Sequence, residues 1–143
     1  MTTNKNQIDK SAFNIPITIY WEDTDAGGIV YHSRYINFAE RARSEWVKQI
    51  FGIKQSEFMK KTGISMVVKL IDVDYLFPAK LDDNLRVNCK LVKFGNTSMD
   101  ISQEIWNEET EKKLVQINVK IVSINRTGKP VPTPKEILEQ LKS

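Results

Sequence analysis

The residues best suited to chemistry lie close together near the amino-terminal end of the chain. Glu22, Asp23 and Asp25 place three carboxylates within four residues. Gly27 and Gly28 follow shortly afterwards. A pair of glycines lets the backbone reach positive φ, so the chain can turn sharply here. Because a carboxylate in such a loop can serve as a nucleophile or a general base, residues 22–28 are the first candidate for an active-site loop.

An amphipathic helix is predicted directly after this loop. Apolar side chains recur at three- and four-residue steps from Tyr35 to Ile50, which is typical of a helix with one buried face. Backbone N–H groups at a helix N-terminus are unpaired and carry roughly half a positive charge. Those around Tyr31 and His32 can therefore stabilise a developing oxyanion. If the glycine turn brings Asp25 towards them, the arrangement suits acyl transfer to water.

Two of these residues also have a purely structural interpretation. An aspartate before a helix is most often a cap or an Asx-turn residue, and on residue type alone this interpretation is favoured for Asp25. His32 is the only histidine of the chain. Its imidazole can orient water or the leaving thiolate near neutral pH. Alternatively, only its backbone N–H matters.

The remaining chain predicts strands. An alternating segment from Ile15 to Trp21 predicts a first strand, after an arm at residues 1–13 that we expect to be flexible. Four β-rich segments separated by turn residues follow the helix, at residues 65–76, 85–94, 98–107 and 114–125. Residues 134–143 are expected to form a helical tail. This order predicts a single α+β domain, in which an antiparallel sheet packs on the long helix.

Composition excludes several classes of function. The chain has 21 Lys and Arg against 18 Asp and Glu, a net charge of +3 that argues against a nucleic-acid partner. One Cys and one His are too few for a zinc site, so we expect no metal. The six glycines form no nucleotide-phosphate loop, and we expect no organic cofactor. We also expect no transmembrane segment and a cytoplasmic location, because no apolar run approaches about 18 residues and the polar opening is unlike a signal peptide.

The run from Tyr20 to His32, with Arg34-Tyr35 and residues 40–43, resembles a known family. It is similar to the hot-dog-fold acyl-CoA thioesterases of the 4-hydroxybenzoyl-CoA thioesterase superfamily, in particular the YbgC-like branch associated with the Tol-Pal cell-envelope system. The resemblance implies a hot-dog fold, a long central helix wrapped by a five-stranded antiparallel sheet. It further implies a homodimer or homotetramer that hydrolyses acyl-CoA or acyl carrier protein thioesters, with coenzyme A as part of the substrate.

The resemblance also assigns roles to single residues. Asp25 matches the catalytic carboxylate of the family, and with the whole motif in place we favour catalysis over capping. The backbone N–H at the helix start falls at His32, with Tyr31 beside it. The expected site therefore comprises catalytic residues Asp25, His32 and Tyr31 and substrate-binding residues Gly27, Gly28 and Val30.

Other interpretations stay open. Glu40 is a second candidate acid, although its charged neighbours at 40–43 favour a solvated or ion-paired face. Cys89 is expected to be a small buried residue. A non-catalytic module that binds acyl thioesters or an envelope complex is the main functional alternative, and a dehydratase is a weaker one. Interior packing is expected for Tyr20, Tyr31, Tyr35 and Trp46, and contacts with the phosphates of coenzyme A are possible for Lys80, Lys93, Arg126 and Lys129.

Overall fold

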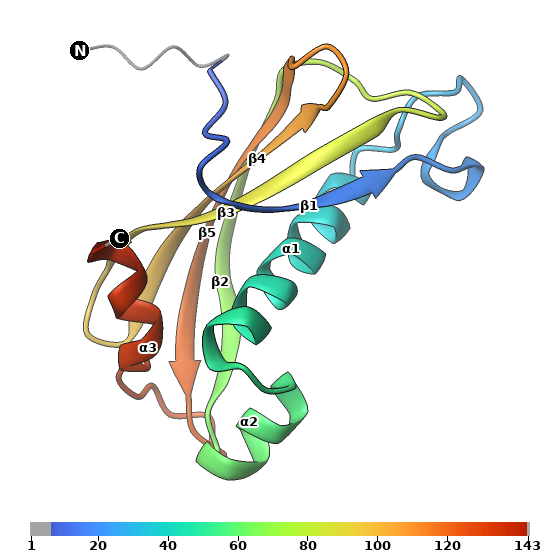
Figure 1. Ribbon diagram of the computed structural model, residues 1–143. Helices are drawn as coiled ribbons and strands as arrows, with labels where there is room; N and C mark the ends of the chain where they lie inside the picture. Colours follow the sequence, from blue (N-terminus) through green and yellow to red (C-terminus); the bar gives the residue numbers. More distant parts are fainter. Residues whose placement is uncertain (1–6, 143) are drawn as a thin grey trace.

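The computed structural model describes residues 7–142 as a twisted antiparallel sheet with a long helix against one face (Figure 1). The sheet has five strands in the order β1-β3-β4-β5-β2. Their bounds are β1 Phe13–Thr18, β2 Ser65–Tyr75, β3 Asn84–Phe94, β4 Ser98–Asn107 and β5 Lys113–Ile124. The helices are α1 Arg34–Phe51, α2 Gln55–Thr62 and α3 Lys135–Leu138. The α+β class and the antiparallel sheet are thus as the sequence predicts.

Helix α1 supplies one half of the core. Its apolar stripe faces the sheet, as the three- and four-residue spacing predicts. The helix ends at Gly52, whose φ of 69° is the left-handed conformation of a helix C-terminus. The buried side chains of α1 meet inward-facing residues of β3, β4 and β5, and the cluster includes Tyr35, Phe38, Ala39, Trp46, Val87, Ile101, Ile105, Ile117 and Val119.

The first strand is shorter than its sequence pattern. It ends at Thr18, and Trp21 begins a short 3-10 turn with a side chain that is 73% exposed. The reason is Asp23, whose buried carboxylate accepts a hydrogen bond from the Tyr20 N–H at 2.9 Å and bends the chain away from the sheet. The expectation that the first strand extends to Trp21 is therefore wrong, although Ile19 is fully buried.

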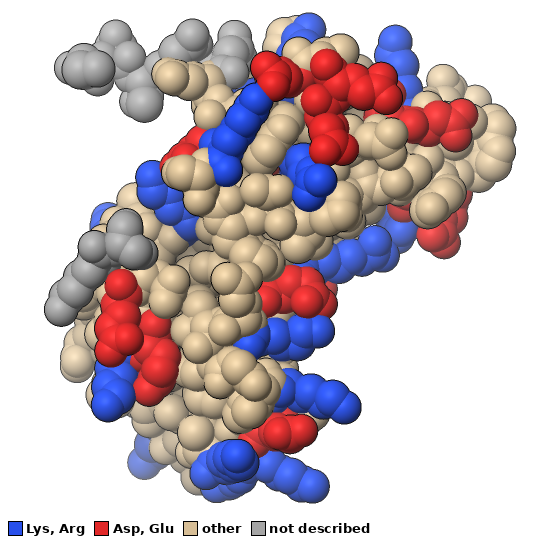
Figure 2. Space-filling model, viewed as in Figure 1, with Lys and Arg blue, Asp and Glu red and all other residues tan. Residues whose placement is uncertain are grey.

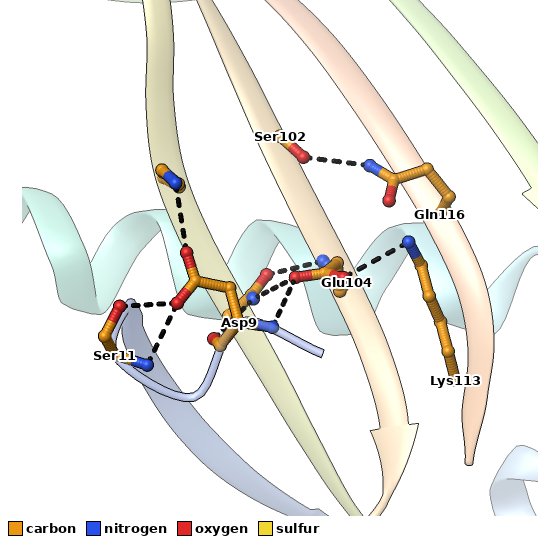
Figure 3. A network of polar contacts seen from close by, with 8 residues as sticks. Asp9, Ser11, Ser102, Glu104, Lys113 and Gln116 are labelled. Atoms are coloured by element: carbon orange, nitrogen blue, oxygen red, sulfur yellow. Dashed lines mark hydrogen bonds and ion pairs between the residues drawn. The ribbon is translucent and has the colours of Figure 1, made fainter. Parts of the chain in front are cut away.

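The amino-terminal arm is also shorter than residues 1–13. Residues 1–6 lie outside the described part of the chain, but Phe13 already pairs with Cys89 in the sheet. Asp9 lies against the face of the sheet opposite α1, where its carboxylate pairs with Lys90 at 3.0 Å (Figure 3). Its backbone N–H donates to Glu104, which in turn pairs with Lys113. These contacts anchor the chain from Asp9 onwards.

The carboxy-terminal tail is helical, as expected from the sequence. Helix α3 continues into a 3-10 helix at Glu139–Lys142, and residue 143 lies outside the described part. Ile137 is fully buried and fixes this tail to the core. Among residues 7–142, no helix combines the length and the apolar character needed to cross a membrane.

Candidate active site

The loop before α1 is a tight turn closed by backbone pairing. Thr24 and Val30 form an antiparallel bridge, and the Asp25 N–H donates to the Ile29 carbonyl at 2.9 Å. The Gly28 N–H donates back to the Asp25 carbonyl at 3.1 Å. Gly28 has a φ of 83°, a conformation that other residue types adopt only with strain. The glycine pair therefore makes the sharp turn that its sequence predicts.

Asp25 is exposed at this turn, and its two carboxylate oxygens have different surroundings. Oδ1 accepts the Gly27 N–H at 2.8 Å, which makes an Asx turn. Within residues 7–142, Oδ2 has no hydrogen-bond partner. A Cβ on residue 27 would lie 3.2 Å from Oδ1, so glycine keeps this approach open. The structural and the chemical interpretations of Asp25 are thus compatible, because one oxygen orients the side chain and the other is available.

Asp23 connects the loop to α1 through an ion pair. Its Oδ1 accepts hydrogen bonds from Arg34 Nη2 at 2.7 Å and from Arg34 Nε at 3.0 Å. Its backbone carbonyl accepts the Tyr31 N–H at 3.0 Å. The side chain is only 4% exposed, so this ion pair is largely removed from water. Asp23 therefore supports the loop, and its carboxylate is engaged by Arg34 and the Tyr20 N–H.

The start of α1 offers unpaired backbone donors, though not all of the expected ones. The Tyr31 N–H is used by Asp23, so it is unavailable to an oxyanion. Neither the His32 nor the Ser33 N–H has a protein acceptor within the described residues. Ser33 occupies the capping position, but its side chain makes no capping hydrogen bond. The available donors are therefore those of His32 and Ser33, and Ser33 was missed by the sequence analysis.

Aromatic side chains surround the same helix start. The Tyr31 ring lies 4.5 Å from the His32 ring, and the Tyr75 ring meets His32 edge-on at 6.4 Å. The Tyr75 hydroxyl donates to the His32 carbonyl at 3.0 Å. Behind them, the Tyr35 hydroxyl accepts the Ala79 N–H at 2.9 Å, and burial raises the pKa of Tyr35. No sequence signal near the motif indicates Tyr75, because it lies 43 residues from His32.

The remaining expected site residues divide between surface and core. Gly27 lies on the surface and Gly28 is partly buried, whereas Val30 is 4% exposed and belongs to the hydrophobic core. Within one chain, Val30 therefore does not line an open site. The packing expectation holds for Tyr35 and Trp46 but is wrong for Tyr20 and Tyr31, which are 62% and 50% exposed. The exposed pair flanks the turn instead of filling the interior.

The acidic and basic residues of α1 have separate environments. Glu40 is exposed and accepts a hydrogen bond from the Ser44 hydroxyl at 3.1 Å, as expected for a solvated face. Arg43, by contrast, is 8% exposed, so its placement on that face was wrong. Its Nη1 donates to Gln103 at 3.0 Å, and burial lowers its pKa. The side-chain nitrogen of Gln103 in turn donates to the Ala39 carbonyl. The buried guanidinium of Arg43 therefore has an oriented polar partner inside the core.

The turn lies on an open surface of the single chain. Four cavities of the described chain have volumes from about 240 to 870 Å³, and none of the four is lined by residues 20–35. The largest lies beside Asp9 and Glu104 on the opposite face of the sheet. Within residues 7–142, no three His, Cys, Asp or Glu side chains are arranged to hold a metal ion.

Cys89 is expected to resist alkylation in the folded protein. It is 2% exposed, and burial raises the pKa of its thiol, so the reactive thiolate is scarce at pH 8. Iodoacetamide labelling followed by intact-mass measurement should show the unmodified chain under native conditions and one added label in urea. Rapid labelling of the native protein at pH 8 would contradict this burial.

A long helix packed against a five-stranded antiparallel sheet is the hot-dog fold, and solved thioesterase structures share it. One is a probable thioesterase from Bartonella henselae, with a TM-score of 0.76 and 29% identity over 85% of this chain and 98% of that chain. A second is a 1,4-dihydroxy-2-naphthoyl-CoA thioesterase from Synechocystis, with a TM-score of 0.82. It is 20% identical and covers 92% of this chain and 96% of its own, and it supports the fold alone.

The chain belongs to the thioesterase-like superfamily, whose family model matches residues 19–141. It is also 34% identical to the acyl-CoA thioesterase YbgC of Haemophilus influenzae over 127 residues, which is 89% of this chain and 92% of that protein. The family resemblance that residues 20–43 indicate is therefore confirmed, and the match extends through β2 to β5. The protein is accordingly a thioester hydrolase by family.

Proposed function

We propose that this protein hydrolyses an acyl-CoA thioester to a free acid and coenzyme A. One observation carries the proposal. The loop and the helix start that follows it contain both an exposed Asp25 carboxylate and, at His32 and Ser33, N–H groups without an acceptor in the described residues. Membership of the thioesterase-like superfamily supports it. The name of the Haemophilus influenzae relative supports an acyl-CoA substrate.

The chemistry follows from these groups. The thioester carbonyl oxygen accepts hydrogen bonds from the His32 and Ser33 N–H groups, which stabilise the negative charge that develops on it. Asp25 Oδ2 either attacks the carbonyl carbon, which expels the coenzyme A thiolate and leaves a mixed anhydride for water to cleave, or removes a proton from an attacking water. We assign protonation of the leaving thiolate to the His32 imidazole. We propose that no metal or organic cofactor takes part.

We propose Lys80 as the basic residue that meets the phosphates of coenzyme A. It forms an isolated antiparallel bridge with Ile29, which brings an exposed cation next to the catalytic turn. Two other candidates are already engaged, since Lys93 pairs with Asp100 at 3.6 Å and Arg126 donates to the Lys60 carbonyl at 2.8 Å. A thioester of acyl carrier protein presents one phosphate to the same cation, so both carriers fit the proposal.

We further propose that the acyl site is completed by a second copy of the chain, in a homodimer or a pair of dimers. Strand β2 is an edge of the sheet and is 11 residues long. It exposes apolar side chains, with Leu70 57% and Val68 45% exposed. A long apolar edge strand has unpaired backbone N–H and C=O groups that can bind another strand. We propose a cytoplasmic location and no nucleic-acid partner. Figure 2 supports the second point, because basic and acidic side chains both occur on the face shown.

The edge proposal predicts the oligomeric state. Light scattering should give at least a dimer at micromolar concentration. Leu70→Lys should shift the protein towards the monomer and lower thioesterase activity, because it places a charge on the paired edge. Met59→Lys, on the exposed side of α2, is the matched control and should stay oligomeric. A monomeric wild type would contradict both the edge pairing and the shared site.

The proposed reaction is tested by identifying its products. The protein is incubated with an acyl-CoA, and mass spectrometry measures the free acid and coenzyme A. Equal amounts of both products support hydrolysis. Recovery of the intact, bound thioester across acyl-CoA and acyl carrier protein substrates would instead favour the non-catalytic binding module.

A further inference from the structure

Tyr75 connects the end of β2 with the backbone at the start of α1. Its hydroxyl donates to the His32 carbonyl at 3.0 Å. Its ring packs between His32 and Tyr35, with ring centres 6.4 and 5.8 Å away, respectively. Among residues 7–142 this is the only side chain that hydrogen-bonds to the His32 carbonyl. The contact therefore fixes the orientation of the peptide plane that follows His32.

That peptide plane carries one of the proposed oxyanion donors. The carbonyl of His32 and the N–H of Ser33 belong to the same peptide unit. A hydrogen bond to an amide oxygen polarises the unit and makes its N–H a stronger donor. The preceding unit is arranged in the same way, because the Tyr31 carbonyl accepts the Arg34 N–H at 2.9 Å and shares its peptide with the His32 N–H. Both available donors thus have engaged carbonyls behind them.

We propose that Tyr75 is a positioning residue for thioester hydrolysis, which orients and strengthens the Ser33 N–H donor through the His32 carbonyl. The inference rests on the proposed function. Tyr75 acts through the backbone, and no contact with the substrate is required of it. Tyr75 is also the last residue of the edge strand β2, which we propose pairs with a second copy. The orientation of the Ser33 donor therefore depends on the position of this strand.

The kinetic test is Tyr75→Phe, which removes the hydroxyl and keeps the ring. The variant should lower kcat by about 3- to 10-fold, less than the loss of a whole oxyanion donor, because the N–H itself remains. KM should stay within about twofold, since the weakened contact matters most when charge develops. Tyr20→Phe is the matched control, because that exposed hydroxyl makes no hydrogen bond within the described residues. An unchanged kcat in Tyr75→Phe would overturn the inference.

A spectroscopic readout separates this inference from the proposed function. Loss of the hydrogen bond at the His32 carbonyl should move the Ser33 amide proton upfield in a ¹⁵N–¹H spectrum of Tyr75→Phe, with no such change in Tyr20→Phe. An unmoved Ser33 resonance would overturn the inference even in an active enzyme. A wild type that hydrolyses no thioester would overturn the proposed function and the positioning role of Tyr75 together.

Discussion

Replacing Asp25 with asparagine is expected to lower kcat for thioester hydrolysis by about 10²- to 10⁴-fold, the range for loss of a catalytic acid or base. The substitution removes the charge from Oδ2, which has no partner within the described residues. It keeps an oxygen that can accept the Gly27 N–H, now 2.8 Å from Oδ1. The turn should therefore persist, and the loss should report chemistry.

The matched control for this variant is Glu22→Gln. Glu22 is an exposed carboxylate three positions before Asp25, and its neutralisation removes the same charge from the same segment. We expect its kcat/KM to stay within about twofold of the wild type, because an exposed charge without a role in the proposed reaction contributes little to binding or catalysis. Both variants should melt at the wild-type temperature. If Asp25→Asn retains most of the activity, Asp25 is not the catalytic carboxylate.

Replacing Asp23 with alanine is expected to lower the free energy of unfolding by about 3 kcal/mol or more, the cost of breaking a buried ion pair from one side. The carboxylate is only 4% exposed, and its partner Arg34 is 25% exposed. The same substitution leaves the Tyr20 N–H without its acceptor. Because the Asp23–Arg34 ion pair holds the loop against α1, activity should fall together with stability.

Urea unfolding of a double-mutant cycle measures the pair directly. Asp23→Ala, Arg34→Ala and the double variant are compared with the wild type. The double variant should be less destabilised than the sum of the single variants, because each single variant leaves one group unpaired. A loss below about 1 kcal/mol in Asp23→Ala would show that the pair behaves like an exposed surface contact.

Elements set by local periodicity could be predicted from the sequence, and elements set by distant contacts could not. Strand β4 has the predicted bounds, and α1 lies where its apolar spacing places it. The end of β1 was misjudged because the side chain of Asp23 ends the strand by binding the Tyr20 N–H. Arg43 was misjudged because its acceptor, Gln103, lies 60 residues away in the core.

The candidate site likewise has a part that the sequence predicts and a part that depends on distant contacts. The turn at residues 24–30 and the start of α1 are contiguous in the sequence, so a motif identifies them together. The motif does not show that the carbonyl of Asp23 occupies the Tyr31 N–H, which moves the available donors to His32 and Ser33. Nor does it show Tyr75, whose position depends on how β2 packs beside α1. Backbone hydrogen bonding between segments thus decides which donors are available.

The most direct test of the central claim is the initial rate of thiol release from short, medium, long and aromatic acyl-CoA thioesters, with wild type and Asp25→Asn side by side. We predict that the wild type releases coenzyme A from at least one substrate, and that the folded variant loses at least about 99% of that rate, the lower end of the range for a catalytic acid or base. Equal rates for the two proteins, or no release by the wild type from any acyl-CoA or acyl carrier protein thioester, would contradict the account.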